Sequence, residues 1–124
     1  MKVVAVVEDN ADNRLLIRAL LGDLYELREY ATGHHALAAF ERSCPDLVLL
    51  DISLVGMDGV EVLQRMRADS RTSHLPVIAL TAHAMSGDRE KYLALGFDEY
   101  VAKPIYDEEL LLGAVARLLK GPSA

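Results

Sequence analysis

Residues 47–59 read LVLLDISLVGMDG. The segment begins with a continuously apolar run, which Asp51 ends, and continues into a loop that contains two glycines. A strand without polar interruptions is typical of the centre of a parallel sheet, because helices cover both of its faces there. Val3–Val7 (VVAVV) has the same character, and Glu8 and Asp9 follow it directly. The two runs predict a parallel sheet whose central strands end in carboxylates.

Short apolar runs alternate along the chain with segments of helical period, which predicts an α/β fold. Five strands are expected, at Val3–Val7, Tyr25–Tyr30, Asp46–Leu50, Pro76–Leu80 and Tyr100–Ala102. The alternating pattern of Tyr25–Tyr30 is typical of an edge strand. Five helices are expected, at Asn13–Leu24, His35–Arg42, Val60–Ala68, Ser86–Leu95 and Asp107–Leu119.

The apolar residues of the first expected helix form one stripe, which predicts the face that packs on the sheet. They are Leu16, Ile17, Leu20, Leu21 and Leu24. The chain contains no internal repeat, linker or shift in composition, so we expect one domain over residues 1–124 with a frayed tail at 121–124.

Composition excludes several classes of protein. With 52% hydrophobic and 26% charged residues in 124, the chain is neither disordered nor of low complexity. The formal net charge of −6 disfavours direct nucleic-acid binding. No apolar run approaches the roughly 20 residues of a membrane helix, and the N-terminus lacks a secretory signal, so we expect no membrane insertion and a cytoplasmic location.

Polar residues follow four of the expected strands: Glu8 and Asp9, Asp51, Thr81, and Lys103. Ligands of open parallel sheets bind beyond the carboxyl ends of the strands, so these side chains are expected to converge. Clustered carboxylates repel one another unless a cation joins them, and Mg²⁺ prefers oxygen ligands. A lysine and a threonine opposite would hold phosphoryl oxygens, with an aspartate as nucleophile.

Each of these residues taken alone has a simpler interpretation. An acid after a strand is commonly a helix cap, a threonine there is an ordinary strand-end residue, and a lysine is a solvated charge. Their joint occurrence at four strand ends favours a phosphoryl-transfer site. The histidines do not favour a metal site, since His34 and His35 are adjacent at a helix start and cannot face one ion together.

Four segments, VVEDN, LVLLDISLVGMDG, PVIALTAHA and GFDEYVAKPI, occur in the order and spacing of response-regulator receiver domains. From Lys2 to about Lys120 the chain resembles that family. The resemblance implies a flavodoxin-like, doubly wound (βα)5 fold with strand order 2-1-3-4-5. It also implies that Asp51 is the phosphoacceptor and binds Mg²⁺ together with Glu8, Asp9 and the backbone carbonyl of Ser53. Mn²⁺ could substitute for Mg²⁺.

The resemblance extends to the residues that respond to phosphorylation. It implies that Thr81 and Lys103 contact the phosphoryl oxygens, that Thr81 and Tyr100 form the switch, and that the Lys103–Pro104 peptide is cis. The resemblance also implies that Ser53 and His83 occupy positions that influence how fast the phosphoryl group is lost.

The chain departs from the family pattern in three places, one of which is the variable pair Ser53 and His83. Val55, followed by glycine, stands where the family often has proline, so the loop is expected to be looser. Glu8 stands where aspartate is common, a substitution that keeps the charge.

As a receiver, the chain is expected to be a stand-alone response regulator of the chemotaxis or sporulation type and not an enzyme, beyond accepting and slowly losing its own phosphoryl group. Its expected donor is a sensor histidine kinase or a histidine phosphotransfer protein. Its expected output is a protein target docked on the face of the fourth helix, fifth strand and fifth helix. We expect a monomer or weak dimer.

Two other functions on related architectures remain open at the level of sequence. A phosphatase with an aspartate nucleophile would have a second aspartate two residues later, where this chain has Ser53. A flavin-binding electron carrier would have a hydroxyl- and glycine-rich loop after the first strand, where residues 8–13 read EDNADN. Both fit the sequence less well than a receiver.

Overall fold

The computed structural model describes residues 1–82, 87–103, 105 and 108–120, and in them five strands alternate with five helices. The strands are β1 (Val3–Val7), β2 (Glu26–Tyr30), β3 (Leu47–Asp51), β4 (Val77–Thr81) and β5 (Glu99–Ala102). They form one parallel sheet in the order β2-β1-β3-β4-β5, as the family resemblance implied. The helices are α1 (Ala11–Leu21), α2 (Gly33–Arg42), α3 (Gly59–Ala68), α4 (Asp88–Leu95) and α5 (Glu108–Lys120).

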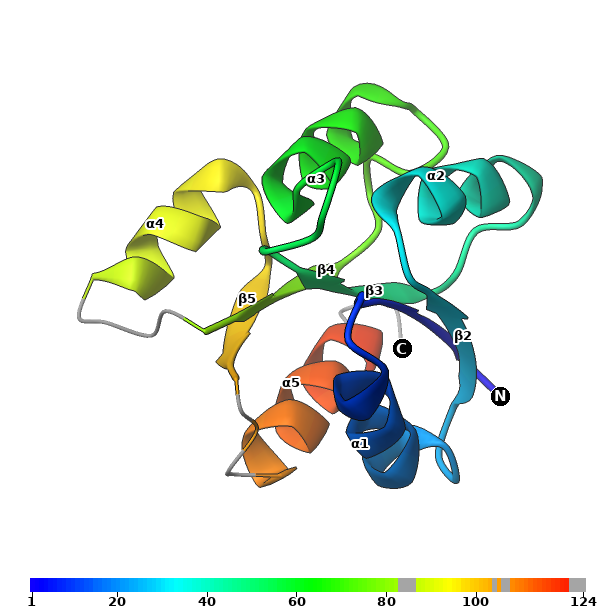
Figure 1. Cartoon of the computed structure of the whole chain (residues 1–124), viewed down its shortest axis with the longest axis vertical. Coiled ribbons are helices and arrows are strands. Elements are labelled where there is room, and N and C mark those ends of the chain that lie inside the picture. Colours follow the sequence, from blue (N-terminus) through cyan, green and yellow to red (C-terminus); the bar gives the residue numbers. More distant parts are fainter. Residues whose placement is uncertain (83–86, 104, 106–107, 121–124) are drawn as a thin grey trace.

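Helices cover both faces of the sheet. Figure 1 shows α2, α3 and α4 on one face and α1 and α5 on the other. Successive strand residues point to opposite faces, so β3 divides its apolar side chains between two cores. Val48 and Leu50 pack with the α2 and α3 residues, whereas Leu47 and Leu49 pack with α1 and α5. The four apolar residues 47–50 of β3 are buried, as their unbroken pattern predicted, and Asp51 at the end of the strand is buried as well.

Helix α1 begins and ends earlier than its hydrophobic period predicts. The side chain of Asn10 accepts a hydrogen bond from the backbone N–H of Asn13, so the helix is capped at residue 10 and begins at Ala11. It ends at Leu21, before Gly22. The expected burial of Leu24 is therefore wrong: this side chain lies in the turn after the helix and is 56% exposed.

The ends of the other elements lie within one to two residues of their expected positions. Ser86, Pro104, Asp107 and the expected frayed tail at 121–124 lie outside the described residues. None of the described helices is both long and apolar enough to span a bilayer.

Candidate functional site

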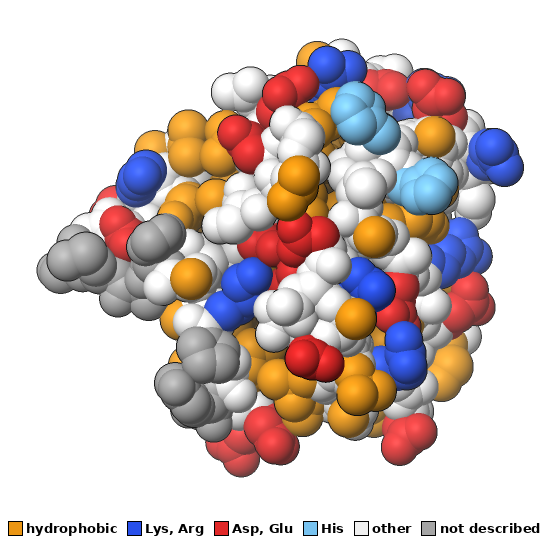
Figure 2. All heavy atoms as spheres, viewed as in Figure 1, with side chains coloured by type: hydrophobic (Ala, Val, Ile, Leu, Met, Phe, Trp, Pro, Cys, Tyr) orange, Lys and Arg blue, Asp and Glu red, His pale blue; other side chains and the backbone are white. Residues whose placement is uncertain are grey.

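Four strand ends bring polar side chains to one edge of the sheet. Asp51 is the last residue of β3 and Thr81 the last of β4, while Glu8 and Lys103 directly follow β1 and β5. The register sets Asp51 opposite Leu80 and Thr81 opposite Ala102, so these ends are nearly level. In Figure 2, acidic side chains gather at the middle of this face with a basic side chain beside them.

The three predicted metal-binding carboxylates lie together. Glu8, Asp9 and Asp51 each offer an oxygen within 4.8 Å of the others. Glu8 is 0% and Asp51 1% exposed, whereas Asp9 is more open to solvent. An all-oxygen donor set with one open side suits a hard divalent cation that keeps several water ligands, as Mg²⁺ does. Among the described residues, this is the one group of three acidic, histidine or cysteine side chains arranged to hold a metal.

Lys103 lies between the two buried carboxylates. Its Nζ is 3.0 Å from Glu8 Oε1 and 3.1 Å from Asp51 Oδ1. Burial by itself lowers the pKa of Lys103, but the hydrogen bonds to Glu8 and Asp51 outweigh burial, and the pKa of Lys103 lies above its usual value. The lysine is therefore a permanent cation at the position where phosphoryl oxygens are expected.

Glu8 is held by more donors than the sequence revealed. Besides Lys103, the backbone N–H of Asn10 donates to Oε2 at 3.0 Å, and Asn13 Nδ2 donates to Oε1 at 3.3 Å. Burial raises the pKa of Glu8 because desolvation disfavours its charged form, and the Asn10 and Lys103 hydrogen bonds only partly oppose that effect. The sequence predicts Asn13 only as the first residue of a helix. Because the Asn10 cap makes α1 begin at Ala11, the Asn13 side-chain amide reaches the Glu8 carboxylate.

The loop after Asp51 fixes the orientation of its carboxylate. The backbone N–H of Ser53 donates to Asp51 Oδ1 at 2.9 Å. Gly59, the first residue of α3, packs so closely that a Cβ there would collide with the backbone carbonyl of Asp51. Asp58 accepts from the Glu61 N–H at 2.9 Å and caps α3, so its carboxylate is committed to the helix.

The departure from the family pattern lies at the outer part of this loop. Val55 is 80% exposed, and Gly56 has a φ of +87°, in the left-handed region that favours glycine. The described loop is thus shaped by a glycine turn where the family often has proline.

Thr81 makes a contact that the sequence did not predict. Its Oγ1 lies 3.0 Å from the hydroxyl of Tyr92 on α4, and both residues are buried. The Tyr92 ring in turn lies 6.0 Å from the ring of Tyr100, the expected switch aromatic. One signal for Tyr92 was present in the sequence, namely a single aromatic residue in an otherwise mostly polar helix.

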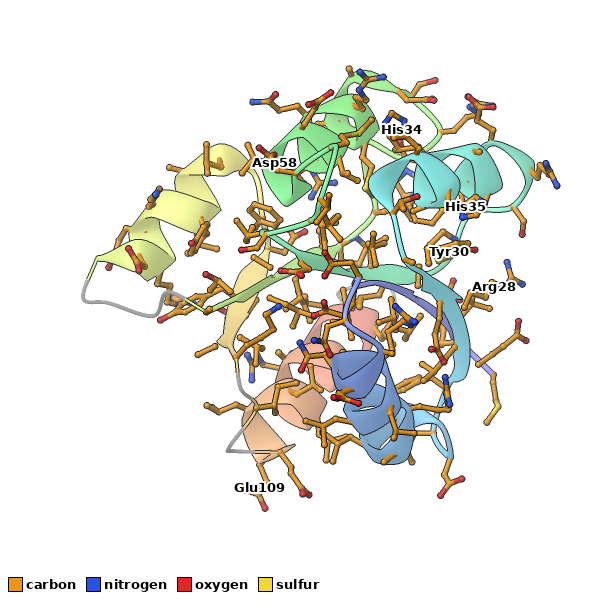
Figure 3. All side chains as sticks on the ribbon, in the orientation of Figure 1. Arg28, Tyr30, His34, His35, Asp58 and Glu109 are labelled. Atoms are coloured by element: carbon orange, nitrogen blue, oxygen red, sulfur yellow. The ribbon has the colours of Figure 1, made fainter. Side chains whose placement is uncertain are left out.

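Some expected features remain predictions. His83 and Pro104 lie outside the described residues, so neither the tuning role of His83 nor the cis peptide is tested. Figure 3 shows His34 and His35 projecting from α2 and Asp58 lying at the start of α3. Neither of these two histidines is among the three side chains of the carboxylate cluster.

Comparisons with known proteins agree with the geometry of the site. Residues 4–115 match the family model of the response regulator receiver domain. The polar-differentiation response regulator DivK of Brucella ovis is 41% identical over 105 residues, which cover 84% of this chain and 85% of DivK. The sensor protein GacS of Pseudomonas syringae pv. syringae is 39% identical over 111 residues. Those residues are 86% of this chain but only 12% of GacS, so the chain spans a small part of that relative.

A solved structure shares the fold and carries a metal. The chain is similar to the receiver domain of a sensor histidine kinase from Pseudomonas aeruginosa PAO1, with a TM-score of 0.86 and 35% sequence identity. The alignment covers 97% of this chain and 98% of the other. That structure has a magnesium ion coordinated in its active-site cleft.

Replacing Asp9 by asparagine should weaken Mg²⁺ binding roughly 10–100-fold, because it removes a charged oxygen from a three-carboxylate cluster. Titration of Mg²⁺ monitored by the thermal unfolding midpoint measures this loss, since a ligand that binds the folded state raises the midpoint. The matched control is Asp12→Asn, which removes the same formal charge from the first turn of α1, three residues further on. Equal Mg²⁺ affinities in wild type and Asp9→Asn would show that Asp9 is not a ligand.

The raised pKa of Glu8 predicts a pH-dependent stability in the metal-free protein. A carboxyl group whose pKa is higher in the folded than in the unfolded state binds protons more tightly when folded, so its ionisation destabilises the fold as the pH rises. The unfolding free energy of wild type minus that of Glu8→Gln should therefore increase as the pH falls from 7 towards the ordinary glutamate pKa. Urea titrations in a chelator measure the difference, and a pH-independent difference over that range would contradict the prediction.

Proposed function

The chain belongs to the response regulator receiver domain family, and from this membership we propose that it is a phosphorylation-controlled signalling domain whose phosphoacceptor is Asp51. One observation carries the proposal: Asp51 is a buried strand-end carboxylate held beside two further carboxylates and an ammonium group. If these residues served only as helix caps and solvated charges, their side chains would not need to converge at one edge of the sheet.

The geometry supports a direct transfer to Asp51. A carboxylate oxygen attacks the phosphorus of a phosphohistidine, the phosphorus–nitrogen bond breaks, and a phosphorus–oxygen bond to Asp51 forms. The Ser53 N–H, at 2.9 Å from Oδ1, orients the carboxylate for this attack. Lys103 is near enough to exchange its contact with Asp51 for one with an incoming phosphoryl oxygen. The Thr81 hydroxyl donates a hydrogen bond to a second phosphoryl oxygen. Positioning and charge neutralisation of this kind dominate phosphoryl transfer.

Glu8, Asp9, Asp51 and the backbone carbonyl of Ser53 would hold the divalent cation, Mg²⁺ with Mn²⁺ as a substitute. The bound cation supplies charge neutralisation between the carboxylates and the phosphoryl oxygens. The chain's own contribution is a cluster that is already assembled, with Glu8 held by Asn10 and Lys103.

The partners follow from the same role. We place a sensor histidine kinase or a histidine phosphotransfer protein as donor, and a protein target on the face formed by α4, β5 and α5. That face carries a cleft lined by Arg89, Glu99, Tyr100 and Arg117, in which Glu99 pairs with Arg89 at 3.1 Å and with Arg117 at 3.5 Å. The cleft is also lined by the apolar residues Val101, Ala102, Leu110 and Ala114. An apolar floor with ion pairs beside it suits a partner that presents both apolar and charged side chains.

The remaining parts of the proposal concern the whole chain. We assign residues 1–124 to one receiver domain that works in the cytoplasm as a monomer or weak dimer, does not bind nucleic acid directly, and catalyses only its own phosphorylation and slow dephosphorylation. Ser53, exposed beside Asp51, and His83 tune the loss of the phosphoryl group. No specific observation favours a phosphatase or a flavin carrier.

Asp51→Asn should abolish labelling by a small-molecule phosphodonor in the presence of Mg²⁺, because the substitution removes the nucleophile and keeps the side-chain shape. Phosphate-affinity electrophoresis measures the labelled fraction. The matched control is Asp58→Asn, which lies in the same loop and should be labelled like wild type, since asparagine caps a helix as well as aspartate does. Labelling that persists in Asp51→Asn would overturn the assignment.

A further inference from the structure

We propose that Tyr92 transmits the phosphorylation state of Asp51 to helix α4, through a chain of hydrogen bonds from a phosphoryl oxygen to the Thr81 hydroxyl and on to the Tyr92 hydroxyl. Tyr92 is a positioning residue in this account, since it acts through Thr81 and does not touch the reacting atoms. The inference rests on the proposed phosphoacceptor role of Asp51. It goes beyond that role by naming the side chain that connects the site to a helix.

The first support is the contact itself. Thr81 Oγ1 and the Tyr92 hydroxyl are 3.0 Å apart, within hydrogen-bond distance, and the two residues are 1% and 4% exposed. Thr81 ends β4 at the carboxylate cluster, whereas Tyr92 lies in the middle of α4. A buried hydrogen bond is electrostatically stronger than one in water, so this contact is sensitive to a new charge beside it.

The second support is the way α4 is attached to the domain. Tyr92 is the one residue of α4 that is buried, so this side chain anchors the helix on the sheet. Its ring packs edge-to-face on Phe97 at 6.1 Å and lies at a tilt to Tyr100 at 6.0 Å. Figure 1 shows α4 beside the edge strand β5, at the margin of the domain. A displacement of Tyr92 would therefore move both α4 and the contact with Tyr100.

The third support is a fixed point at the C-terminal end of α4. The Arg67 guanidinium on α3 donates to the carbonyl of Gly96 at 2.9 Å and to Asp98 at 3.1 Å. Gly96 itself caps α4 with a φ of +114°, in the left-handed region. With this end held, a pull on Tyr92 tilts the rest of the helix about Gly96 and does not translate the helix as a whole.

The chemistry of the two hydroxyls gives the direction of the effect. A hydroxyl both donates and accepts, so in the unphosphorylated protein either Thr81 or Tyr92 can be the donor. Phosphoryl oxygens only accept. Once Thr81 donates to one of them, its own oxygen faces Tyr92 as an acceptor, and Tyr92 must donate. Phosphorylation thus fixes which hydroxyl donates and which accepts in this series of hydrogen bonds. Hydrogen bonds in such a series strengthen one another.

Tyr92→Phe tests the inference, because it removes the hydroxyl and keeps the ring packed on Phe97 and Tyr100. Beryllofluoride with Mg²⁺ serves as the phosphoryl mimic, and amide NMR shifts are read at two places: around Asp51, and along α4. We expect Tyr92→Phe to retain the shifts around Asp51, to lose most of the α4 response, and to bind beryllofluoride about fivefold more weakly, the effect of one lost hydrogen bond. Tyr30→Phe, which changes a tyrosine on β2, should respond like wild type.

A double-mutant cycle separates coupling from a merely structural role. Thr81→Val removes the other hydroxyl, so if the two hydroxyls act as one chain, adding Tyr92→Phe to Thr81→Val should weaken the response no further. Thr81→Ser should restore the α4 response, since it returns the hydroxyl. An unchanged α4 response in Tyr92→Phe, or additive losses in the cycle, would overturn the inference. Failure of wild type to bind beryllofluoride would instead contradict the proposed function.

Discussion

Two carboxylates buried at the same edge of a sheet, with one ammonium group between them, set the constraint on which the rest of this structure depends. Glu8 and Asp51 both lie within about 3 Å of Lys103 Nζ, and neither is open to solvent. Burying a charge is costly unless it is paired and hydrogen-bonded. Lys103 supplies one positive charge against three carboxylates, so the cluster is balanced more completely once a divalent cation joins it.

The strand order makes this arrangement possible. Because β1, β3, β4 and β5 are neighbours in a parallel sheet, residues up to 95 positions apart, as Glu8 and Lys103 are, meet at one edge. The surrounding backbone then holds them in place, through the Asn10 N–H that donates to Glu8 and the close approach of Gly59 to Asp51. In the proposed function, such preorganisation would serve phosphoryl transfer at a cost in stability, a trade that is common at functional sites.

Much of this site follows from the sequence because strand ends are easy to recognise there. The unbroken apolar runs 3–7 and 47–50 locate β1 and β3, and the polar residues after them are Glu8 and Asp51. The strand order came from family resemblance, since periodicity does not determine which strands are neighbours. Leu24 was misplaced because the hydrophobic period continues past the point where α1 ends. The contacts of Asn13 and Tyr92 depend on how α1 and α4 dock on the sheet, which no local pattern specifies.

The central claim is that this edge of the sheet exists to carry a phosphoryl group on one particular carboxylate. The most direct measurement is to treat the protein with a phosphodonor and Mg²⁺, reduce the acyl phosphate with borohydride, and locate the reduced residue by peptide mass spectrometry. The account predicts that the reduced residue is Asp51 and that a chelator prevents its formation. Modification of Asp9 or Asp58 in its place, or of no carboxylate at all, would contradict it.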